Sequence, residues 1–247
     1  MKLALVADLH ANREAVAAVL AHADAQRPDR YAFLGDFVGY GADPGWVIDV
    51  VRERIAAGAV AVGGNHDAAV VRGPLPTMTP VARTAVAWTR ARLDAAQLAF
   101  LDTLPLTATE GESLLVHANA WAPAAWEYIL GRADAARSML ATERRTTFCG
   151  HVHAPALYHQ TSTGKTGAFT PTPGIAIPLS EQRHWLAIPG SAGQPRDGNP
   201  AACYAMFDDR ARTLVFYRVP YDHERAAAKV RAAGLPQDLA DRLHDGT

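Results

Sequence analysis

One stretch near the start of the chain decides the fold, Leu3-Ala4-Leu5-Val6-Ala7-Asp8-Leu9-His10-Ala11-Asn12. Its apolar residues predict a buried β-strand over residues 2–7, which ends at a carboxylate and an imidazole two residues apart. Because residues i and i+2 of an extended segment point to the same side, Asp8 and His10 could both reach one metal ion beyond the sheet edge. A lone Asp-x-His pair often occurs by chance, so a metal site requires further ligands from later segments.

Length and composition indicate a single globular domain over residues 1–247. The chain has 247 residues, 49% of them hydrophobic, and a formal net charge of -1. A chain of this size can bury a full hydrophobic core. Acidic and basic residues are interspersed without a basic run, so the composition indicates no nucleic-acid partner.

The cysteines and the N-terminus bear on the compartment. Two cysteines, Cys149 and Cys203, are too few for a disulfide framework, which favours a reducing cytoplasm. The first apolar run is broken at Asp8 and is too short for a signal peptide, and no stretch approaches the length of a membrane span. We therefore expect a cytoplasmic protein without a membrane partner, whose oligomeric state the sequence does not indicate.

Strands and helices alternate in the first part of the chain. Asn12 is a suitable N-cap for a helix to about Gln26, and an apolar strand follows at 31–34. A second helix runs from Pro44 to about Ala57, before a short strand at 59–62. This order predicts a βαβ core with parallel strands. Ligands of such sheets collect beyond the carboxyl ends of the strands, so the polar clusters after these strands belong on one edge.

The rest of the chain is predicted as helices followed by short strands. Two helices are expected within 80–104, strands at 106–109 and 113–116, a helix at 133–142 and a strand at 146–149. Six later strands separated by Gly and Pro indicate an antiparallel half (156–160, 166–169, 175–178, 185–188, 201–207 and 213–219). Two short helices, 222–233 and 236–244, close the chain.

Residues 118–144 form a candidate lid or cap within the domain. They carry Trp121, Trp126 and Tyr128, which could stack a nucleotide base, and lead into the Ala-rich helix. Packing of these aromatic side chains between the helix and the core explains them equally well, and both interpretations stay open. Tyr40 is assigned to the surface or the core.

Five predicted strand ends carry side chains with oxygen or nitrogen donors, and Gly stands beside most of them. The donors are Asp8, His10, Asp36, Asn65, His66, His117, His151 and His153. Each one alone has a simple structural explanation, such as turn chemistry for Gly35-Asp36. Five such endings on one sheet edge are hard to explain by turns, and together they predict a metal centre.

These motifs, taken in order, resemble those of the calcineurin-like metallophosphoesterase superfamily. They are Asp8-x-His10, Gly35-Asp36, Gly64-Asn65-His66-Asp67, His117 and Gly150-His151-x-His153. The stretches 8–12, 35–41 and 189–198 further resemble its small bacterial and archaeal phosphoesterase branch. The resemblance implies an α/β fold, α+β in some schemes, built as a four-layer αββα sandwich of mixed sheets with a dinuclear metal site at the sheet edge.

Carried over residue by residue, the resemblance implies two metal positions that share one carboxylate. The first ion would be held by Asp8, His10, Asp36 and His153, and the second by Asp36, Asn65, His117 and His151. Imidazole nitrogens suit divalent transition metals, with manganese as the first candidate and iron, zinc or nickel as the others.

The resemblance also implies roles for residues beside the metals. His66 is left over from the ligand set and would be the general acid that protonates the leaving oxygen, with Asp67 orienting it. A hydrogen bond from His66 to the metal site is the alternative. Asn65 would also contact substrate. Arg196, after a tight turn at 190–193 that returns the chain near the metals, could bind a substrate phosphate or pair with Asp197.

The expected reaction is hydrolysis of a phosphodiester or phosphomonoester of a small molecule, with nucleotides as the first candidates. Two ions can lower the pKa of a shared water, hold phosphoryl oxygens and neutralise charge. A bridging hydroxide would then attack phosphorus directly, without a phospho-enzyme. A protein phosphatase of the same fold and an interaction scaffold with weak catalysis are the alternatives. The intact ligand set and His66 argue against the scaffold.

Overall fold

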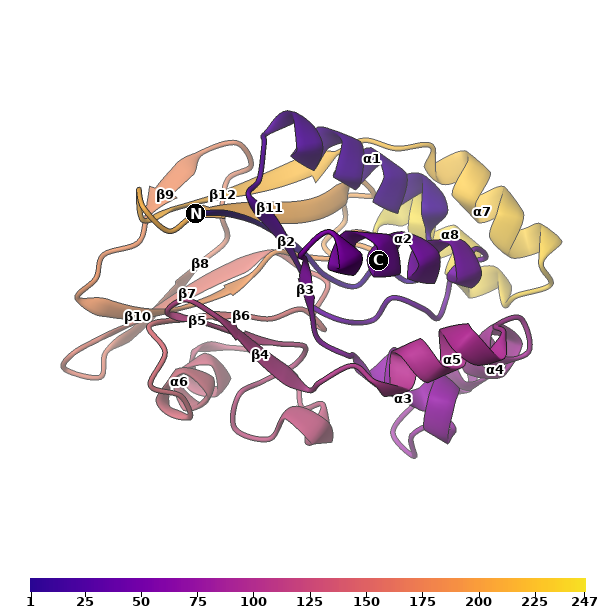
Figure 1. Ribbon diagram of the computed structural model, residues 1–247, viewed down its shortest axis with the longest axis horizontal. Helices are drawn as coiled ribbons and strands as arrows, with labels where there is room; N and C mark the ends of the chain where they lie inside the picture. The colour runs from indigo at the N-terminus through magenta and orange to yellow at the C-terminus, as the bar shows by residue number, and fades with distance from the viewer.

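Two six-stranded mixed sheets pack face to face between helices in the computed structural model, which describes residues 1–247 (Figure 1). The first sheet has the order β3 (Val60–Ala61), β2 (Arg30–Phe33), β1 (Lys2–Val6), β11 (Ala202–Asp208), β12 (Thr213–Val219) and β9 (Ala176–Pro178). The second has the order β4 (Thr107–Glu110), β5 (Ser113–Val116), β6 (Thr146–Phe148), β10 (Arg183–Ile188), β7 (Ala156–Thr161) and β8 (Thr166–Phe169).

Strand β1 shows how the sequence builds the layers. Leu3 and Leu5 lie in the core between the two sheets, together with Phe148 of the second sheet. Ala4 and Val6 alternate with them and face the helices on the other side, as the two-residue period of a strand requires. The predicted αββα sandwich is therefore confirmed.

Helices cover both outer faces of the sandwich. Helices α1 (Arg13–Ala25) and α2 (Pro44–Ala56) lie on the first sheet, and α6 (Arg132–Leu140) lies on the second. Asn12 caps α1 as predicted, since its side-chain oxygen accepts the amide of Ala15 at 3.1 Å. Helices α4 (Pro80–Arg90), α5 (Ala95–Asp102), α7 (His223–Ala232) and α8 (Gln237–Asp245) complete the predicted set. None of the helices is long and apolar enough to span a membrane.

Two features differ from the sequence-based expectation. No helix was expected between the strand at 59–62 and residue 80, yet helix α3 (Asn65–Arg72) forms there and begins inside the ligand motif. The six late strands also form no separate antiparallel half. Strands β9, β11 and β12 extend the first sheet, whereas β7, β8 and β10 extend the second, and β10 runs parallel to β6. Hydrophobic alternation reports that a strand has a buried face but does not identify its neighbour.

The parallel strands of both sheets direct their carboxyl ends to one edge. Strands β1, β2 and β3 run parallel to one another, and so do β5, β6 and β10 in the other sheet. The segment that follows each of these six strands carries at least one of the predicted site residues, in a loop or, after β3, at the start of α3. The sheet topology thus brings segments that are up to 188 residues apart, Asp8 and Arg196, to the same place.

Candidate metal centre

The predicted ligands converge in two buried groups that share Asp36. One group consists of Asp8, His10, Asp36 and His153, and the other of Asp36, His117 and His151. Within each group the donor atoms lie within 4.8 Å of one another. Asn65 joins the second group, because its Oδ1 lies 3.1 Å from His117 Nε2. We call these the first and the second group below.

Asp36 lies where a bridging carboxylate is needed. Its Oδ2 is 3.7 Å from Nε2 of His10 and 3.4 Å from Nε2 of His117, so one oxygen faces both groups. Its Oδ1 accepts the backbone amide of His66 at 2.8 Å. This second contact fixes the carboxylate plane and leaves Oδ2 directed between the two groups.

Each imidazole ligand is held by a backbone carbonyl on one of its ring nitrogens. The Nδ1 atoms of three histidines meet carbonyl oxygens, His10 with Val38 at 3.1 Å, His117 with Leu34 at 2.7 Å and His153 with Gln194 at 2.7 Å. His151 is turned the other way, with Nε2 at 2.9 Å from the Trp126 oxygen. A carbonyl can only accept, so these nitrogens carry the protons and the opposite nitrogens present lone pairs to the interior.

The inward lone pairs face one another at short distances. Nε2 of His10 and Nε2 of His153 are 3.0 Å apart, and Nε2 of His117 is 3.2 Å from Nδ1 of His151. Two acceptors at such a separation repel unless a cation or a proton lies between them. Nitrogen and oxygen donors of this kind suit divalent transition metals. The residues present therefore fit one ion in each group.

Burial and charge shift the ionisation of these groups. Burial raises the pKa of Asp8 to about 7, and the nearby Asp36 carboxylate adds to the effect. Burial alone would lower the pKa of His117. The charge of Asp36 and its hydrogen bond outweigh burial and raise the pKa of that imidazole to about 9. Burial lowers the pKa of His10 and of His153 well below the usual value. Such closely spaced, perturbed groups are typical of functional sites.

Five ligands adopt a backbone conformation that side chains rarely take. The φ angles are 54° at Asp8, 45° at His10, 55° at Asp36, 68° at His151 and 64° at His153. Positive φ in residues other than Gly is uncommon and strained. The sharp turns allow residues two positions apart to reach the buried centre: Asp8 and His10 both join the first group, whereas His151 joins the second and His153 the first.

The turn at 190–193 returns the chain to the predicted metal ligands, as expected, and is hydrogen-bonded to the loop that carries Asp8. The carbonyl oxygen of Asp8 accepts the Ser191 hydroxyl at 2.7 Å and the Gly193 amide at 2.9 Å. Only Gly fits at residue 193, because a Cβ there would lie 1.9 Å from the oxygen of Leu9. The first group is thereby fixed by a tightly packed turn.

Asp67 does not orient His66, and this expectation is corrected. No hydrogen bond joins the two side chains. The buried Asp67 carboxylate instead accepts four backbone amides, those of Gly64 and Asp36 at 2.9 Å, of Phe37 at 2.9 Å and of Val38 at 3.3 Å. Asp67 is the third residue of α3, so its carboxylate reaches back over the helix start. Asp67 therefore links the loop that carries Asp36 to the start of the helix that carries Asn65, and it acts as a positioning residue.

His66 lies beside the centre without belonging to either group. Its ring meets the ring of His10 edge-on at 5.1 Å and that of Tyr40 at 4.4 Å. Its Nδ1 is buried without a hydrogen-bond partner, and burial lowers the pKa of the imidazole. His66 also lines a cavity of about 280 Å³, together with Asn65 and His151. A polar atom is thus available beside the metal ligands.

Arg196 also lies at the centre, and it does not pair with Asp197. Asp197 binds Arg218 instead. One Arg196 nitrogen donates to Gln194 Oε1 at 2.9 Å, while its Nε is buried without a partner. After burial, Arg196 is the next cause that lowers the pKa of His153. The guanidinium is therefore close to the first group and retains an unused donor.

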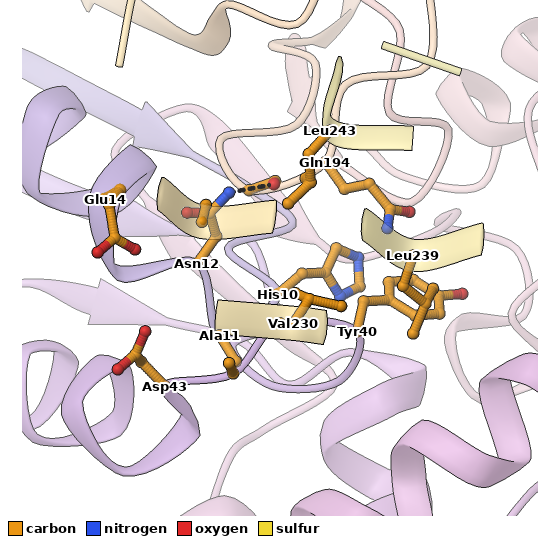
Figure 2. A pocket seen from close by; sticks show the side chains of 14 residues that line it. His10, Ala11, Asn12, Glu14, Tyr40, Asp43, Gln194, Val230, Leu239 and Leu243 are labelled. Atoms are coloured by element: carbon orange, nitrogen blue, oxygen red, sulfur yellow. Dashed lines mark hydrogen bonds between the residues drawn. The ribbon is translucent and has the colours of Figure 1, made fainter. Parts of the chain in front are cut away.

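Tyr40 is a site residue that the sequence analysis missed. Its ring lies 4.6 Å from that of His10, and Figure 2 shows the two side by side. Tyr40 has a φ of 64° and stands between Gly39 and Gly41. The unusual Gly-Tyr-Gly sequence directly after the Asp36 motif was the available signal.

The predicted lid divides into two parts. Trp126 and Tyr128 line the cavity beside His66, and the Tyr128 ring stacks on His151 at 3.9 Å. Trp121 points elsewhere and packs against the Arg137 guanidinium at 4.5 Å. Helix α6 packs on the outer face of the second sheet. Within residues 118–144, the stretch with Trp126 and Tyr128 therefore borders the site, and helix α6 does not.

Comparison with known proteins agrees with this geometry. Residues 1–211 match the family described as the calcineurin-like phosphoesterase superfamily domain. The chain belongs to this superfamily. Members of the calcineurin-like superfamily are metal-dependent phosphoesterases, and the buried His and Asp groups of this chain could bind metal.

Three known proteins are similar to this chain over nearly its full length. The uncharacterized protein MJ0912 of Methanocaldococcus jannaschii is 32% identical over 249 residues, which cover 99% of this chain and 98% of that protein. A metallophosphoesterase from Sphaerobacter thermophilus has a similar structure, with a TM-score of 0.87 and 37% identity over 100% of this chain and 99% of that one. The hypothetical protein PH1004 from Pyrococcus horikoshii OT3 shares the fold, with a TM-score of 0.79 and 16% identity over 100% and 98%.

Proposed function

We propose that the protein is a dinuclear metal-dependent phosphoesterase that hydrolyses a phosphodiester or phosphomonoester of a small molecule. The observation that carries the proposal is the pair of inward-facing donor groups on either side of Asp36 Oδ2. Membership of the calcineurin-like superfamily supports the reaction class. Manganese is the first candidate for both ions, and iron, zinc or nickel would suit the same donors.

Two bound ions would supply an activated water and the positive charge that phosphoryl transfer needs. The ligands keep that charge, because only Asp8 and Asp36 are anionic among them and the amide and imidazole ligands are neutral. An anionic phosphate ester is therefore attracted to the centre. The chain needs no nucleophile of its own for this reaction.

His66 is the proposed general acid. Burial lowers the pKa of His66 and so favours the neutral imidazole in the free protein. A phosphate dianion bound beside it would raise that pKa and favour the protonated form. From there Nδ1, which has no other hydrogen-bond partner, or the opposite ring nitrogen can donate a proton to the leaving oxygen. Proton donation of this kind contributes roughly 10²–10⁴ to the rate.

Arg196 and Asn65 are the proposed phosphate contacts. The Arg196 guanidinium lies near the first group with an unpartnered Nε, and guanidinium groups bind phosphate oxygens through charged hydrogen bonds. Asn65 contributes its Oδ1 to the second group and also lines the cavity. The two side chains would therefore orient the ester from opposite sides.

The cavity beside His66 has room for a small organic group of the substrate. Its volume of about 280 Å³ is near the lower end for small-molecule sites. Its lining includes the aromatic side chains of Trp126 and Tyr128 and the apolar side chains of Leu75 and Met78. Flat aromatic walls of this kind suit a nucleotide base. A concave site also favours a small molecule over the protein substrate of a protein phosphatase, for which a shallow, open site would be expected.

A metal and substrate screen tests the proposal. The protein is stripped of metal and given Mn, Ni, Zn or Mg singly, and each form is assayed with a chromogenic phosphodiester, a chromogenic phosphomonoester and a panel of nucleotides. We expect hydrolysis with a transition metal and background rates in chelator. Background rates with every metal would instead favour an interaction scaffold of this fold.

A further inference from the structure

One segment of the chain touches ligands of the second group alone. Residues 119–128, here called the 119–128 segment, hold His151 through the Trp126 carbonyl at 2.9 Å and through the Tyr128 ring, which stacks on the imidazole at 3.9 Å and is nearly parallel to it at 15°. The indole of Trp126 also meets the His117 ring at 5.8 Å. None of the hydrogen bonds or ring contacts of Asp8, His10 or His153 involves this segment.

The carbonyl that holds His151 is aimed by an unusual backbone turn. Trp126 follows the short 3₁₀ helix η1 (Pro123–Ala125) and has a φ of 57° and a ψ of 30°, the left-handed conformation. The turn is closed by Asn119, whose amide donates to the Glu127 oxygen and whose Oδ1 accepts the Ala122 amide, both at 2.8 Å. The 119–128 segment contains no sheet strand, and these hydrogen bonds order it together with one from the Ala120 amide to Ser138 Oγ of α6 at 3.0 Å.

The surroundings of the segment leave it room to move. Trp126 lines the cavity of about 280 Å³ beside His66 and also a second cavity of about 290 Å³, which Leu75 and Leu104 border. The carbonyls that hold the other three imidazoles belong to Leu34, Val38 and Gln194, all fully buried. A residue bordered by cavities is displaced at a lower cost in free energy than one packed on all sides. The support of His151 is therefore the weakest of the four.

We propose that the 119–128 segment sets the affinity of the second metal position by fixing the tautomer and the orientation of His151. Coordination through Nδ1 requires the proton on Nε2, and the Trp126 oxygen is the acceptor that keeps it there. Loss of such an outer partner typically weakens metal binding by about 10–100-fold. Trp126 and Tyr128 are then positioning residues. This inference rests on the proposed dinuclear centre.

Two substitutions at residue 126 separate the carbonyl from the indole. Trp126→Asn removes the indole but tolerates positive φ, so the carbonyl stays in place. Trp126→Pro also removes the indole, but its ring holds φ near −65° and displaces the carbonyl. The residue 126 amide makes no backbone hydrogen bond, so proline removes no such bond there. Tyr128→Phe and Tyr128→Ala form a second pair, which keeps or removes the ring stacked on His151.

The test is a Mn²⁺ titration of the metal-free proteins, with bound metal measured by equilibrium dialysis and spin coupling by electron paramagnetic resonance. We expect the wild type, Trp126→Asn and Tyr128→Phe to bind two coupled ions. Trp126→Pro should bind the first ion normally and the second about 10–100-fold more weakly, with the uncoupled signal of a single ion. Tyr128→Ala should change in the same direction by less.

The outcomes separate this inference from the function on which it rests. Equal binding of both ions by Trp126→Pro and the wild type would overturn the inference and leave the dinuclear centre intact. Equal weakening of both positions would also overturn it, because the segment touches only the second group. A wild type that binds fewer than two ions contradicts the proposed dinuclear function itself.

Discussion

The two halves of the centre use similar ligands in different surroundings. The first group is enclosed on two accounts. The turn at 190–193 is hydrogen-bonded to Asp8, and helix α8 packs beside His10. The gap between His10 and α8 holds only about 10 Å³, room for about one water molecule, and Leu239 and Leu243 of α8 lie over it (Figure 2). The second group instead borders the cavity of about 280 Å³ that His151 lines.

This difference separates two tasks that one metal centre must perform. The closed half keeps its ligands in fixed positions, which favours a permanently bound ion. The open half faces the space in which a substrate would lie. Its ligand His151 is supported by the 119–128 segment, which borders two cavities. Similar ligand sets would therefore give two positions of unequal affinity, because the support of the ligands differs.

The largest effect is expected where the two halves meet. Asp36→Ala removes the oxygen that faces both groups and should empty both metal positions, so that turnover falls to background. Asp24→Ala is the matched control, since that carboxylate pairs with Arg54 at the surface. Metal content per chain is measured by mass spectrometry. Retention of two ions by Asp36→Ala would refute the bridging role.

A smaller effect is expected from His66, which belongs to neither half. His66→Ala should keep both ions and lower turnover by roughly 10²–10⁴, because it removes the proton donor and no ligand. His184→Ala, at a histidine on β10 outside the site, should leave turnover unchanged. Unaltered turnover in His66→Ala would rule out the acid role, and loss of metal would assign the residue to the centre itself.

The smallest effect is expected from Arg196, on the closed side. Arg196→Gln should lower kcat/KM by about 10–100-fold, mainly through KM, as expected when a charged hydrogen bond to substrate is lost. Both ions should stay bound. Arg52→Gln is the control, because Arg52 pairs only with Asp49 on α2. An unchanged KM would contradict the phosphate contact and leave Arg196 a structural role.

The convergence of the candidate ligands was predictable because their side chains follow strands directly. Asp8, Asp36 and His117 stand within three residues of a strand end, and the parallel order of those strands already implied one edge. The first and second groups found in the structure combine the same residues that the resemblance implied. The four layers followed from the resemblance, and the continuous apolar run Leu3-Ala4-Leu5-Val6 agrees with a strand that is buried on both faces.

The supports of the ligands were not predictable. Three of the four imidazoles are anchored by the backbone oxygens of Leu34, Val38 and Gln194, and a carbonyl leaves no signature in a side-chain pattern. The role of Asp67 was hidden for the same reason, because its partners are backbone amides. Tyr40 carried the signal of two flanking glycines, yet its contact with His10 depends on the fold.

Two ions are proposed to lie on either side of Asp36, and anomalous diffraction at the manganese edge would locate them. Crystals of the Mn²⁺-loaded protein should show two peaks that flank Asp36 Oδ2, about 3.5–4 Å apart as in other two-metal sites. The first should contact His10 and His153, and the second His117 and His151. A single peak, or two peaks without Asp36 between them, would contradict the account.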